Sequence, residues 1–274
     1  MGKYTAVIYR RAIEIYKKEG LRSLLSSMQL YIFRRYNIHM RACKLQSMIK
    51  GSKTHQIGDN AITVPLEKDY QIKRFCTVHN EKILLDDMID ELNENEIIYD
   101  IGAYLGWHTL TAASIATEGM TVAFEPHPQS YDRLTEVVET TAKGDVQLHN
   151  LALSNENGTS MINEANTSSA NLFVESENGI EIKSVRGDGF IEREGLPFPT
   201  TIKIDVEGSE VSVLRGLEKT ISRSECRLIY CELHPDTAPE REEVNKVVRD
   251  LLKQYGFKVS YLDHNRKNII KATR

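Results

Sequence analysis

The sequence contains little cysteine, and no pattern gives its four cysteines a structural use. Cys43, Cys76, Cys226 and Cys231 form no C-x-x-C pair and no zinc-binding spacing, so we expect reduced thiols in a cytoplasmic protein rather than a disulfide scaffold. The sequence also lacks any apolar run of about 18 residues, which excludes a transmembrane helix. Charges interrupt every apolar stretch of the first twenty residues, so we expect no signal peptide.

Acidic residues are nearly absent from the first part of the chain. The whole sequence has 39 acidic residues against 35 lysines and arginines, which gives a net charge of −4. Residues 1–55 contain twelve basic residues, but only Glu14 and Glu19 oppose them. The small net charge therefore hides a basic arm on an acidic body, and its value describes neither part.

Apolar residues recur at helical spacing within the basic arm, over residues 4–15 and again over 21–32. We predict a helical arm at 1–50, a turn-rich linker at 51–60 and a folded domain at 61–274. One interpretation packs the arm on the body with its charges solvated or paired. The other makes it a peripheral anchor on an anionic membrane surface, at the inner face of a membrane. A nucleic-acid partner is disfavoured, because the body is acidic and no interleaved aromatic motif accompanies the basic run.

Short apolar runs alternate with helical patterns from residue 96 onward. This alternation predicts an α/β fold with a doubly wound, mostly parallel sheet buried on both faces. The predicted strands are 62–66, 72–78, 97–101, 121–124, 146–153, 201–205 and 227–231. The predicted helices are 81–92, 107–117, 130–142, 209–221 and 240–255, and residues 154–170 are expected to form a loop or an edge hairpin.

The end of the chain distinguishes two kinds of Rossmann-like fold. Residues 257–262 and 268–271 are strand-like and are joined by a turn, which predicts an antiparallel hairpin. Such a hairpin closes the sheet of class I methyltransferases. Nicotinamide dehydrogenases normally end in another crossover, so the tail favours the methyltransferase fold.

A glycine loop follows the strand at 97–101. Its glycines, Gly102 and Gly106, have the spacing G-x-x-x-G rather than the G-x-G-x-x-G that seats a pyrophosphate. Asp100 directly before the loop would repel a pyrophosphate but suits the cationic end of S-adenosylmethionine. Glu125 ends the next strand, at a spacing where an acid accepts the hydroxyls of a ribose. The alternatives are a plain strand–helix turn and a solvated glutamate before a turn proline.

The third strand is followed by a segment that could read an adenine edge with its main chain, around Ala152 and Leu153. The fourth strand ends in a more unusual set of charges. Lys203 and Asp205 alternate with apolar residues and are expected to share one face, and Glu207 and Glu210 follow at once. Charge is costly at a buried strand end, so such a cluster is usually paired, functional or both. An acidic helix start capped by Ser209 is the alternative for Glu210.

The fifth strand ends in Glu232 and His234, which are two residues apart and therefore share a side. A histidine of near-neutral pKa, oriented by a carboxylate, is a workable general base for a hydroxyl group. The hypothesis assigns deprotonation to Asp205 or His234, with Glu232 as the orienting group. A structural histidine before a proline is the alternative.

Four segments within residues 97–235 resemble the FkbM family of S-adenosylmethionine-dependent methyltransferases. They are DIGAYLGWHT (100–109), AFEPHP (123–128), LALSNENG (151–158) and, most specifically, IKIDVEGSEVSVLRGL (202–217). The resemblance implies O-methylation of a hydroxyl on a sugar, glycan or related metabolite. It implies cofactor contacts at Asp100, Gly102, Ala103, Gly106, Glu125, Ala152 and Leu153. It also implies catalytic or substrate-side roles for the segment from Lys203 to Glu210, with Asp205 and Glu207, and these add to the roles already assigned to Glu232 and His234.

Two positions depart from the family pattern. Tyr104 stands where the family usually has asparagine, and only Asp188 is carried over from an acidic stretch before the fourth strand. The scheme requires no metal, although Asp205, Glu207, Glu232 and His234 together could hold a divalent cation that lowers the pKa of a hydroxyl. The remaining alternatives are a nicotinamide dehydrogenase and a non-catalytic protein that keeps an adenosyl pocket.

Overall fold

The computed structural model describes residues 51–68, 71, 74–75, 82–163, 179–234, 241–262 and 268–274. The predicted helical arm at 1–50 lies outside these residues. The chain divides into two compact units, residues 1–53 with 66–77 and residues 54–65 with 78–274. The sheet, the helices and the candidate site described below all belong to the second unit.

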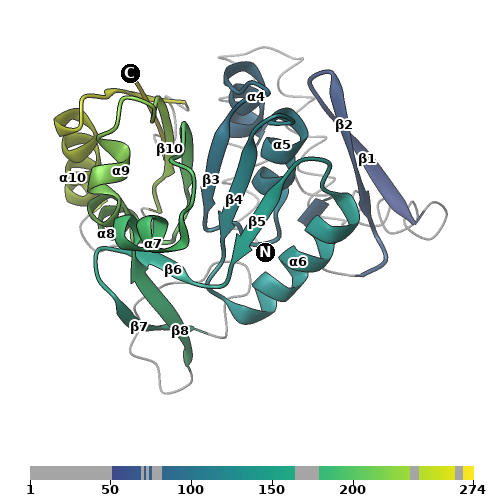
Figure 1. Ribbon diagram of the computed structural model, residues 1–274, viewed down its shortest axis with the longest axis horizontal. Coiled ribbons are helices and arrows are strands. Elements are labelled where there is room, and N and C mark those ends of the chain that lie inside the picture. The colour runs from purple at the N-terminus through teal and green to yellow at the C-terminus, as the bar shows by residue number, and fades with distance from the viewer. Residues whose placement is uncertain are drawn as a thin grey trace, which may run out of the picture. The chain divides into compact units, whose positions relative to one another are not determined.

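A seven-stranded sheet forms the centre of this unit (Figure 1). Its strands are β3 (Ile97–Ile101), β4 (Met120–Phe124), β5 (Val146–His149), β9 (Thr201–Ile204), β10 (Leu228–Glu232), β11 (Lys258–Tyr261) and β12 (Ile269–Thr273). Their order is β11-β12-β10-β9-β3-β4-β5, and β12 is antiparallel to both of its neighbours. Strands β5, β4, β3, β9 and β10 are parallel. The predicted mostly parallel sheet with an antiparallel C-terminal hairpin is confirmed.

Helices cover both faces of this sheet, as a doubly wound fold requires. They are α4 (Lys82–Glu91), α5 (Trp107–Ile115), α6 (Pro128–Thr141), α7 (Gly187–Glu194), α8 (Glu210–Gly216), α9 (Glu218–Ile221) and α10 (Arg241–Gln254). Successive strand residues point to opposite faces. Tyr99 of β3 therefore packs in one core with Val213 of α8 and Val248 of α10, whereas its neighbour Ile98 packs with Met88 of α4 in another.

The predicted linker at 51–60 is wrong, because most of it is a strand. Strands β1 (Ser52–Ile57) and β2 (Asn60–Pro65) form a two-stranded sheet, with the hydroxyls of Thr54 and Thr63 3.0 Å apart. Only Gly58 and Asp59 form the turn, and Gly58 has a φ of +54°. The polar composition of residues 51–60 concealed the alternation of an exposed hairpin. The strand predicted at 72–78 also fails where the structure describes it, since residues 74–75 are helical.

The single strand predicted at 146–153 is two strands in different sheets. Asn150 and Leu151 separate them, and the side-chain amide of Asn150 donates to the backbone oxygen of Glu125 at 2.8 Å. Strand β6 (Ala152–Ser154) then leaves the main sheet and joins β8 (Gly179–Arg186) and β7 (Gly158–Asn163) in the order β6-β8-β7. Of the expected loop or edge hairpin at 154–170, the described part contains an edge strand, β7. Strand β8 was not predicted.

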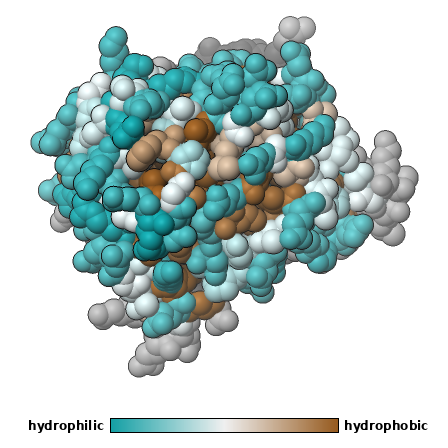
Figure 2. Space-filling model, viewed as in Figure 1, coloured by the Kyte–Doolittle hydropathy of each residue, from teal (hydrophilic) through white to brown (hydrophobic). Residues whose placement is uncertain are grey.

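The face of the molecule in Figure 2 is mostly polar, and apolar residues reach the surface in a band across its middle. Among the described residues, the large apolar side chains most open to solvent are Ile83, Met161 and Phe198, which come from separate parts of the chain. In the part of the chain that the structure describes, no helix is long and apolar enough to cross a membrane.

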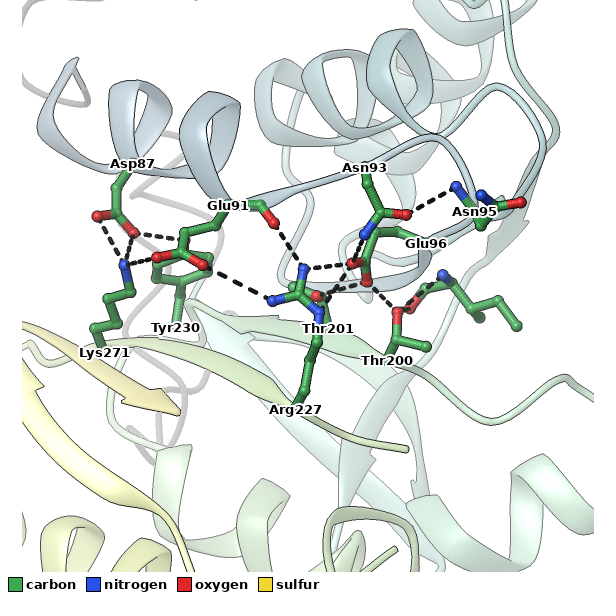
Figure 3. Close-up of polar contacts among 11 residues, drawn as sticks. Asp87, Glu91, Asn93, Asn95, Glu96, Thr200, Thr201, Arg227, Tyr230 and Lys271 are labelled. Atoms are coloured by element: carbon green, nitrogen blue, oxygen red, sulfur yellow. Dashed lines mark hydrogen bonds and ion pairs between the residues drawn. The ribbon is translucent and has the colours of Figure 1, made fainter. Parts of the chain in front are cut away.

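A network of charges joins α4 to the strands of the main sheet (Figure 3). We call Asp87, Glu91, Glu96, Arg227 and Lys271 the amino-edge network, because Glu96 and Arg227 directly precede β3 and β10. The guanidinium of Arg227 binds the carboxylate of Glu96, and Lys271 Nζ lies 2.6 Å from Glu91 and 2.8 Å from Asp87. Hydroxyl groups add to it, since Thr201 Oγ1 donates to Glu96 at 3.0 Å and the Tyr230 hydroxyl donates to Asp87 at 2.6 Å.

Candidate active site

The glycine loop connects β3 to α5 and requires both of its glycines. Gly102 has a φ of +83°, and a Cβ at this position would lie 1.9 Å from the backbone oxygen of Asp205. Gly106 has a φ of +84°, and its Cβ would lie 2.6 Å from a methyl group of Leu134. L-residues with side chains rarely adopt this left-handed conformation. The space that each glycine opens is thus filled by the protein itself, and Gly102 brings the loop against the end of β9.

Asp100 lies beneath the loop rather than open to a ligand. Its side chain is 1% exposed, accepts a hydrogen bond from Thr109 Oγ1 at 2.6 Å and lies 3.0 Å from Lys203 Nζ. The same ammonium donates to the backbone oxygen of Gly102 at 3.0 Å. Asp100 therefore anchors the loop together with Lys203. A direct pairing of Asp100 with a cationic cofactor, as expected from the sequence, would have to compete with this ion pair.

Glu125 follows β4 and holds the other side of the loop. Its two carboxylate oxygens accept backbone N–H groups, one from Tyr104 at 2.7 Å and one from His127 at 2.9 Å. Burial raises the pKa of Glu125 to about 7, and the two N–H groups oppose this rise. Tyr104 itself is left-handed, with a φ of +51°. This conformation suits asparagine better than tyrosine, which gives a physical reason for the family pattern at that position.

A pocket lies at the carboxyl ends of β3, β4 and β9, beside the small sheet. The empty space along its wall is about 410 Å³, and this volume includes open solvent in front of the wall. Its lining includes Gly102, Pro126, Ala152, Leu153, Val206 and Ser209. Open α/β sheets bind ligands outside the carboxyl ends of their strands, where the strand order reverses. Here the order reverses between β3 and β9, so the pocket lies where this rule expects a ligand.

The predicted cofactor residues gather around this pocket but do not all line it. Gly102, Ala152 and Leu153 are part of its wall, and Glu125 lies between the wall residues Phe124 and Pro126. Ala103 is buried, and its N–H donates to the backbone oxygen of Phe124 at 3.1 Å. The mostly apolar wall suits an adenine ring, and the neighbouring carboxylate of Glu125 suits a ribose. The residues present therefore fit an adenosyl group.

Ser209 is a site residue that the sequence suggested only as a helix cap. Its side chain makes no capping bond at the start of α8. It is 7% exposed and lines the pocket, and its buried hydroxyl has no hydrogen-bond partner among the described residues. A buried polar group without a partner is costly, and a ligand in the pocket would supply one. Sequence alone could not have found this role, because a serine before a helix normally caps it.

The acidic segment and the fifth strand form a chain of alternating charges. We call Asp100, Lys203, Asp205, His234 and Glu210 the carboxyl-edge network. The ammonium of Lys203 lies 3.2 Å from Asp205, whose other oxygen lies 3.2 Å from His234 Nε2. Nδ1 of His234 lies 3.2 Å from Glu210. The predicted shared face of Lys203 and Asp205 is confirmed by their contact. Lys203 is 2% exposed, so these partners are what make a buried ammonium tolerable.

The charge state of His234 differs from the expected one. Hydrogen bonds to Asp205 and Glu210 outweigh burial and raise the pKa of His234 to about 11. Lys203 and His234 hold the pKa of the Asp205 carboxyl well below its ordinary value. The expected near-neutral histidine is therefore wrong, and an imidazolium that keeps its proton cannot accept another. Asp205 and Glu210 fill the orienting role expected of Glu232, whose carboxylate accepts from Asn268 at 3.4 Å.

Glu207 lies next to this network in a strained turn. Its φ is +45°, and Gly208 after it has a φ of +98°. A carboxylate oxygen of Glu207 lies 3.6 Å from His234 Nε2, and the side chain is 22% exposed. Burial raises the pKa of Glu207, with the nearby carboxylates of Asp205 and Glu210 adding to the rise and His234 opposing it. Strained non-glycine residues cluster at functional sites, which draws attention to this position.

Two further expectations concern residues around this site. Within the described ranges, no group of three or more His, Cys, Asp and Glu side chains is arranged to hold a metal ion. Asp188 has a structural role away from the pocket, because its carboxylate accepts the N–H groups of Lys219 and Thr220 at 2.9 Å and so fixes the start of α9.

Comparison with known proteins agrees with this arrangement. Residues 100–259 match the methyltransferase FkbM domain family. The chain is 26% identical over 203 residues to the hexuronic acid methyltransferase AglP of Haloferax volcanii, an alignment that covers 74% of this chain and 82% of AglP.

Solved structures also align with this chain, at lower sequence identity than AglP. One is Aeropyrum pernix fibrillarin with bound S-adenosyl-L-methionine, at a TM-score of 0.43 and 12% identity over 70% of this chain and 73% of that one. Another is the magnesium protoporphyrin IX methyltransferase of Synechocystis PCC 6803, also with bound cofactor, at a TM-score of 0.42 and 13% identity over 76% of this chain and 85% of that one.

Proposed function

Because this chain belongs to the FkbM methyltransferase domain family, we propose that it methylates a hydroxyl group of a sugar or glycan. The protein is an S-adenosylmethionine-dependent methyltransferase, and the acceptor is the proposed part. Family membership rules out the nicotinamide dehydrogenase and argues against a protein that only binds an adenosyl group. The antiparallel β12 is likewise unlike the final crossover of a dehydrogenase.

The chain offers a coherent set of residues for the cofactor. Ala152 and Leu153 supply an apolar wall for the adenine, Glu125 supplies carboxylate oxygens for the ribose, and Ser209 supplies a free hydroxyl. When bound, S-adenosylmethionine supplies a methyl group whose bond to sulfur breaks, with the electron pair left on sulfur, as the acceptor oxygen bonds to the carbon. What the protein contributes is alignment of the acceptor and removal of the hydroxyl proton.

The observation that carries the proposal is the set of carboxylates beside the pocket. Asp205 and Glu207 flank the wall residue Val206, and both are partly exposed. Carboxylates accept hydrogen bonds from hydroxyl groups and repel an anionic acceptor group. A hexuronic acid, the substrate class named for the relative AglP, has both hydroxyls and a carboxylate. For this chain the local charge favours a hydroxyl oxygen as the acceptor atom.

The test uses two probes that differ only in the carboxylate. The protein is incubated with methyl-labelled S-adenosylmethionine and either methyl β-D-glucopyranoside or methyl β-D-glucopyranosiduronic acid, and labelled products are treated with mild alkali. A methyl ether survives this treatment, whereas a methyl ester releases methanol. We expect an alkali-stable product. An alkali-labile product from the uronic acid alone would overturn the hydroxyl assignment, and failure to bind S-adenosylhomocysteine in calorimetry would overturn the cofactor site.

The location of the protein stays a prediction. The basic arm at 1–50 has the charge and spacing of a peripheral anchor for anionic membrane surfaces, and this would suit a lipid-linked glycan as the acceptor. The arm lies outside the described residues, and the proposed methyl transfer does not depend on it.

A further inference from the structure

Three carboxylates surround the imidazolium of His234, and two of them are already fully engaged. One oxygen of Asp205 lies 3.2 Å from His234 and the other 3.2 Å from Lys203. Glu210 is 2% exposed, and its Oε1 accepts the N–H of Gly208 at 3.0 Å as well as lying 3.2 Å from His234. A carboxylate held between cations is a weak base, and a buried one cannot reach an acceptor. Glu207 is the third carboxylate.

Glu207 differs from both in geometry. Its contact with His234 is longer, at 3.6 Å, and its side chain is 22% exposed. The residues on either side of the turn, Val206 and Ser209, line the pocket, so Glu207 lies at the pocket's border. Independently, the buried hydroxyl of Ser209 has no hydrogen-bond partner among the described residues and lines the pocket, so a ligand there would satisfy it. The left-handed backbone of Glu207 is strained, and such strain is kept where the position of a side chain matters.

We propose that Glu207 is the general base that takes the proton from the acceptor hydroxyl. This inference rests on the proposed function. The O–H bond breaks, its electron pair stays on the acceptor oxygen that bonds to the methyl carbon, and the proton passes to a carboxylate oxygen of Glu207. Water then removes that proton, and the carboxylate is restored for the next turnover.

The surrounding charges suit this role. Asp205 and Glu210 both raise the pKa of Glu207, whereas His234 lowers it without cancelling the effect of burial. A base with a pKa above the ordinary glutamate value accepts a proton more readily than Asp205, whose pKa is lowered. His234 keeps its proton and holds the three carboxylates together, and it is therefore a positioning residue.

The backbone of Glu207 makes informative variants available. Glu207→Gln keeps the shape and removes the base. Glu207→Gly suits the left-handed backbone and leaves room for formate as an external base. Glu225→Gln is the matched control, because Glu225 is an exposed glutamate that pairs with Arg223 outside the pocket. Rates are measured with whichever of the two glycosides the protein methylates in the test above. Binding of S-adenosylhomocysteine is measured by calorimetry.

We expect Glu207→Gln to lower kcat by about 100-fold or more while the affinity for S-adenosylhomocysteine changes less than about twofold. Formate should raise the activity of Glu207→Gly and leave the activity of the wild-type protein unchanged. In Glu207→Gln, the fall of kcat at low pH should disappear. A Glu207→Gln variant that keeps more than a tenth of the wild-type kcat would overturn the proposal.

Failure of the base and failure of the proposed function give different results. An alkali-labile product refutes the hydroxyl acceptor whatever the Glu207 variants do. A stable ether with unaffected variants refutes only the base. The pKa of Glu207 can also be measured without an acceptor, by NMR titration of protein labelled with ¹³C in its glutamate carboxyl groups. The signal missing from Glu207→Gln is assigned to Glu207. A pKa of Glu207 above 4.5 supports the proposal, and one below 4.5 overturns it.

Discussion

The main sheet has a charge network at each end of its strands, and the two have the same composition. Each contains three carboxylates and two cations. In the amino-edge network, Arg227 and Glu91 are 34% and 36% exposed, and hydroxyls of Thr201 and Tyr230 add hydrogen bonds. There Glu96 is the buried member, at 2%. In the carboxyl-edge network, Lys203, Asp100 and Glu210 are at most 2% exposed, and His234 and Asp205 are 18% and 25% exposed. The same charges therefore work in different surroundings.

The surroundings decide what each network does. Where water reaches the ions, as at Arg227, an ion pair mainly joins elements, here α4 and the sheet. Where a buried cation anchors the network, as Lys203 does, each charge sets the protonation state of the next, as the pKa shifts of His234 and Asp205 show. Backbone strain is also found only at the carboxyl ends, where the non-glycine left-handed residues among those described are Tyr104 and Glu207. Chemistry is expected at the strained carboxyl end, where buried charges lie beside partly exposed ones.

Removing one lysine from each network should give the largest contrast. Lys203→Met leaves Asp100 buried and unpaired, and we expect it to lower the free energy of unfolding by about 3–5 kcal/mol. Lys271→Met leaves Asp87 and Glu91 with other partners or water, and about 1 kcal/mol is expected. Urea unfolding of both variants measures the difference. Equal losses would show that burial does not distinguish the two networks.

Gly102 and Gly195 both have a positive φ, but only Gly102 is closely packed, so substituting each distinguishes the cost of backbone strain from that of a steric clash. Gly102→Ala meets the backbone of Asp205, so we expect the loop to move and the affinity for S-adenosylhomocysteine to fall about 100-fold. Gly195, after α7, has a φ of +64° and nothing within 4 Å of an added Cβ. Gly195→Ala should cost only the backbone strain, about 1–2 kcal/mol of stability, with unchanged affinity. Calorimetry and urea unfolding test both, and loss of affinity in Gly195→Ala would contradict this reasoning.

The pH dependence of cofactor binding should report Glu125. If its ionised form accepts the ribose hydroxyls, affinity rises with pH through a pKa of about 7, by about tenfold between pH 6 and pH 8. The effect on folding has the opposite sign. A pKa raised above the unfolded value stabilises the fold fully below pH 4.5, and this stability is lost as pH rises through about 7.

Calorimetric titrations with S-adenosylhomocysteine across this pH range check the prediction for Glu125. Glu125→Gln is the control, since it keeps the shape and should remove the pH dependence. A wild-type affinity that does not change between pH 6 and pH 8 would show that the carboxylate of Glu125 takes no part in binding.

Ser209 should give the smallest effect. Ser209→Ala removes a hydroxyl that has no partner in the described residues, so stability without ligand should stay the same or rise. If that hydroxyl binds the cofactor, affinity for S-adenosylhomocysteine falls about 5- to 10-fold. Ser222→Ala, at an exposed serine bonded to Glu218, is the matched control. Equal affinities of wild type and Ser209→Ala would assign the hydroxyl to the acceptor or to no ligand.

Much of the fold could be predicted because its signals are local. Short apolar runs marked β3, β4, β9 and β10, and the turn in the tail marked the antiparallel hairpin. The strand at 62–66 predicted most of β2, but β1 was missed because polar exposed strands and linkers have similar compositions. The split between β5 and β6 was missed because it depends on Asn150 binding the backbone of Glu125, a contact that no local pattern contains.

The sequence predicted which residues gather at the site, but not their protonation states or orientations. Lys203, Asp205 and His234 were selected correctly as neighbours, and their contacts confirm it. The near-neutral pKa expected of His234 is not what the structure gives, because two carboxylates surround the imidazole, one of them on α8. Ser209 was hidden for the same reason, since its orientation relative to the pocket depends on how β9 and α8 pack.

The amino-acid sequence by itself determined most strands of the main sheet, the helices between them and which ionisable residues end the strands, because periodicity and turn chemistry act over a few residues. Only the tertiary structure decided which of these charges neutralise one another. Lys203 donates to Gly102 across 101 residues of chain, and the pKa values of Asp205 and His234 depend on distances that exist only after the strands assemble. Protonation depends on burial and on neighbouring charge, and both are properties of the packed molecule.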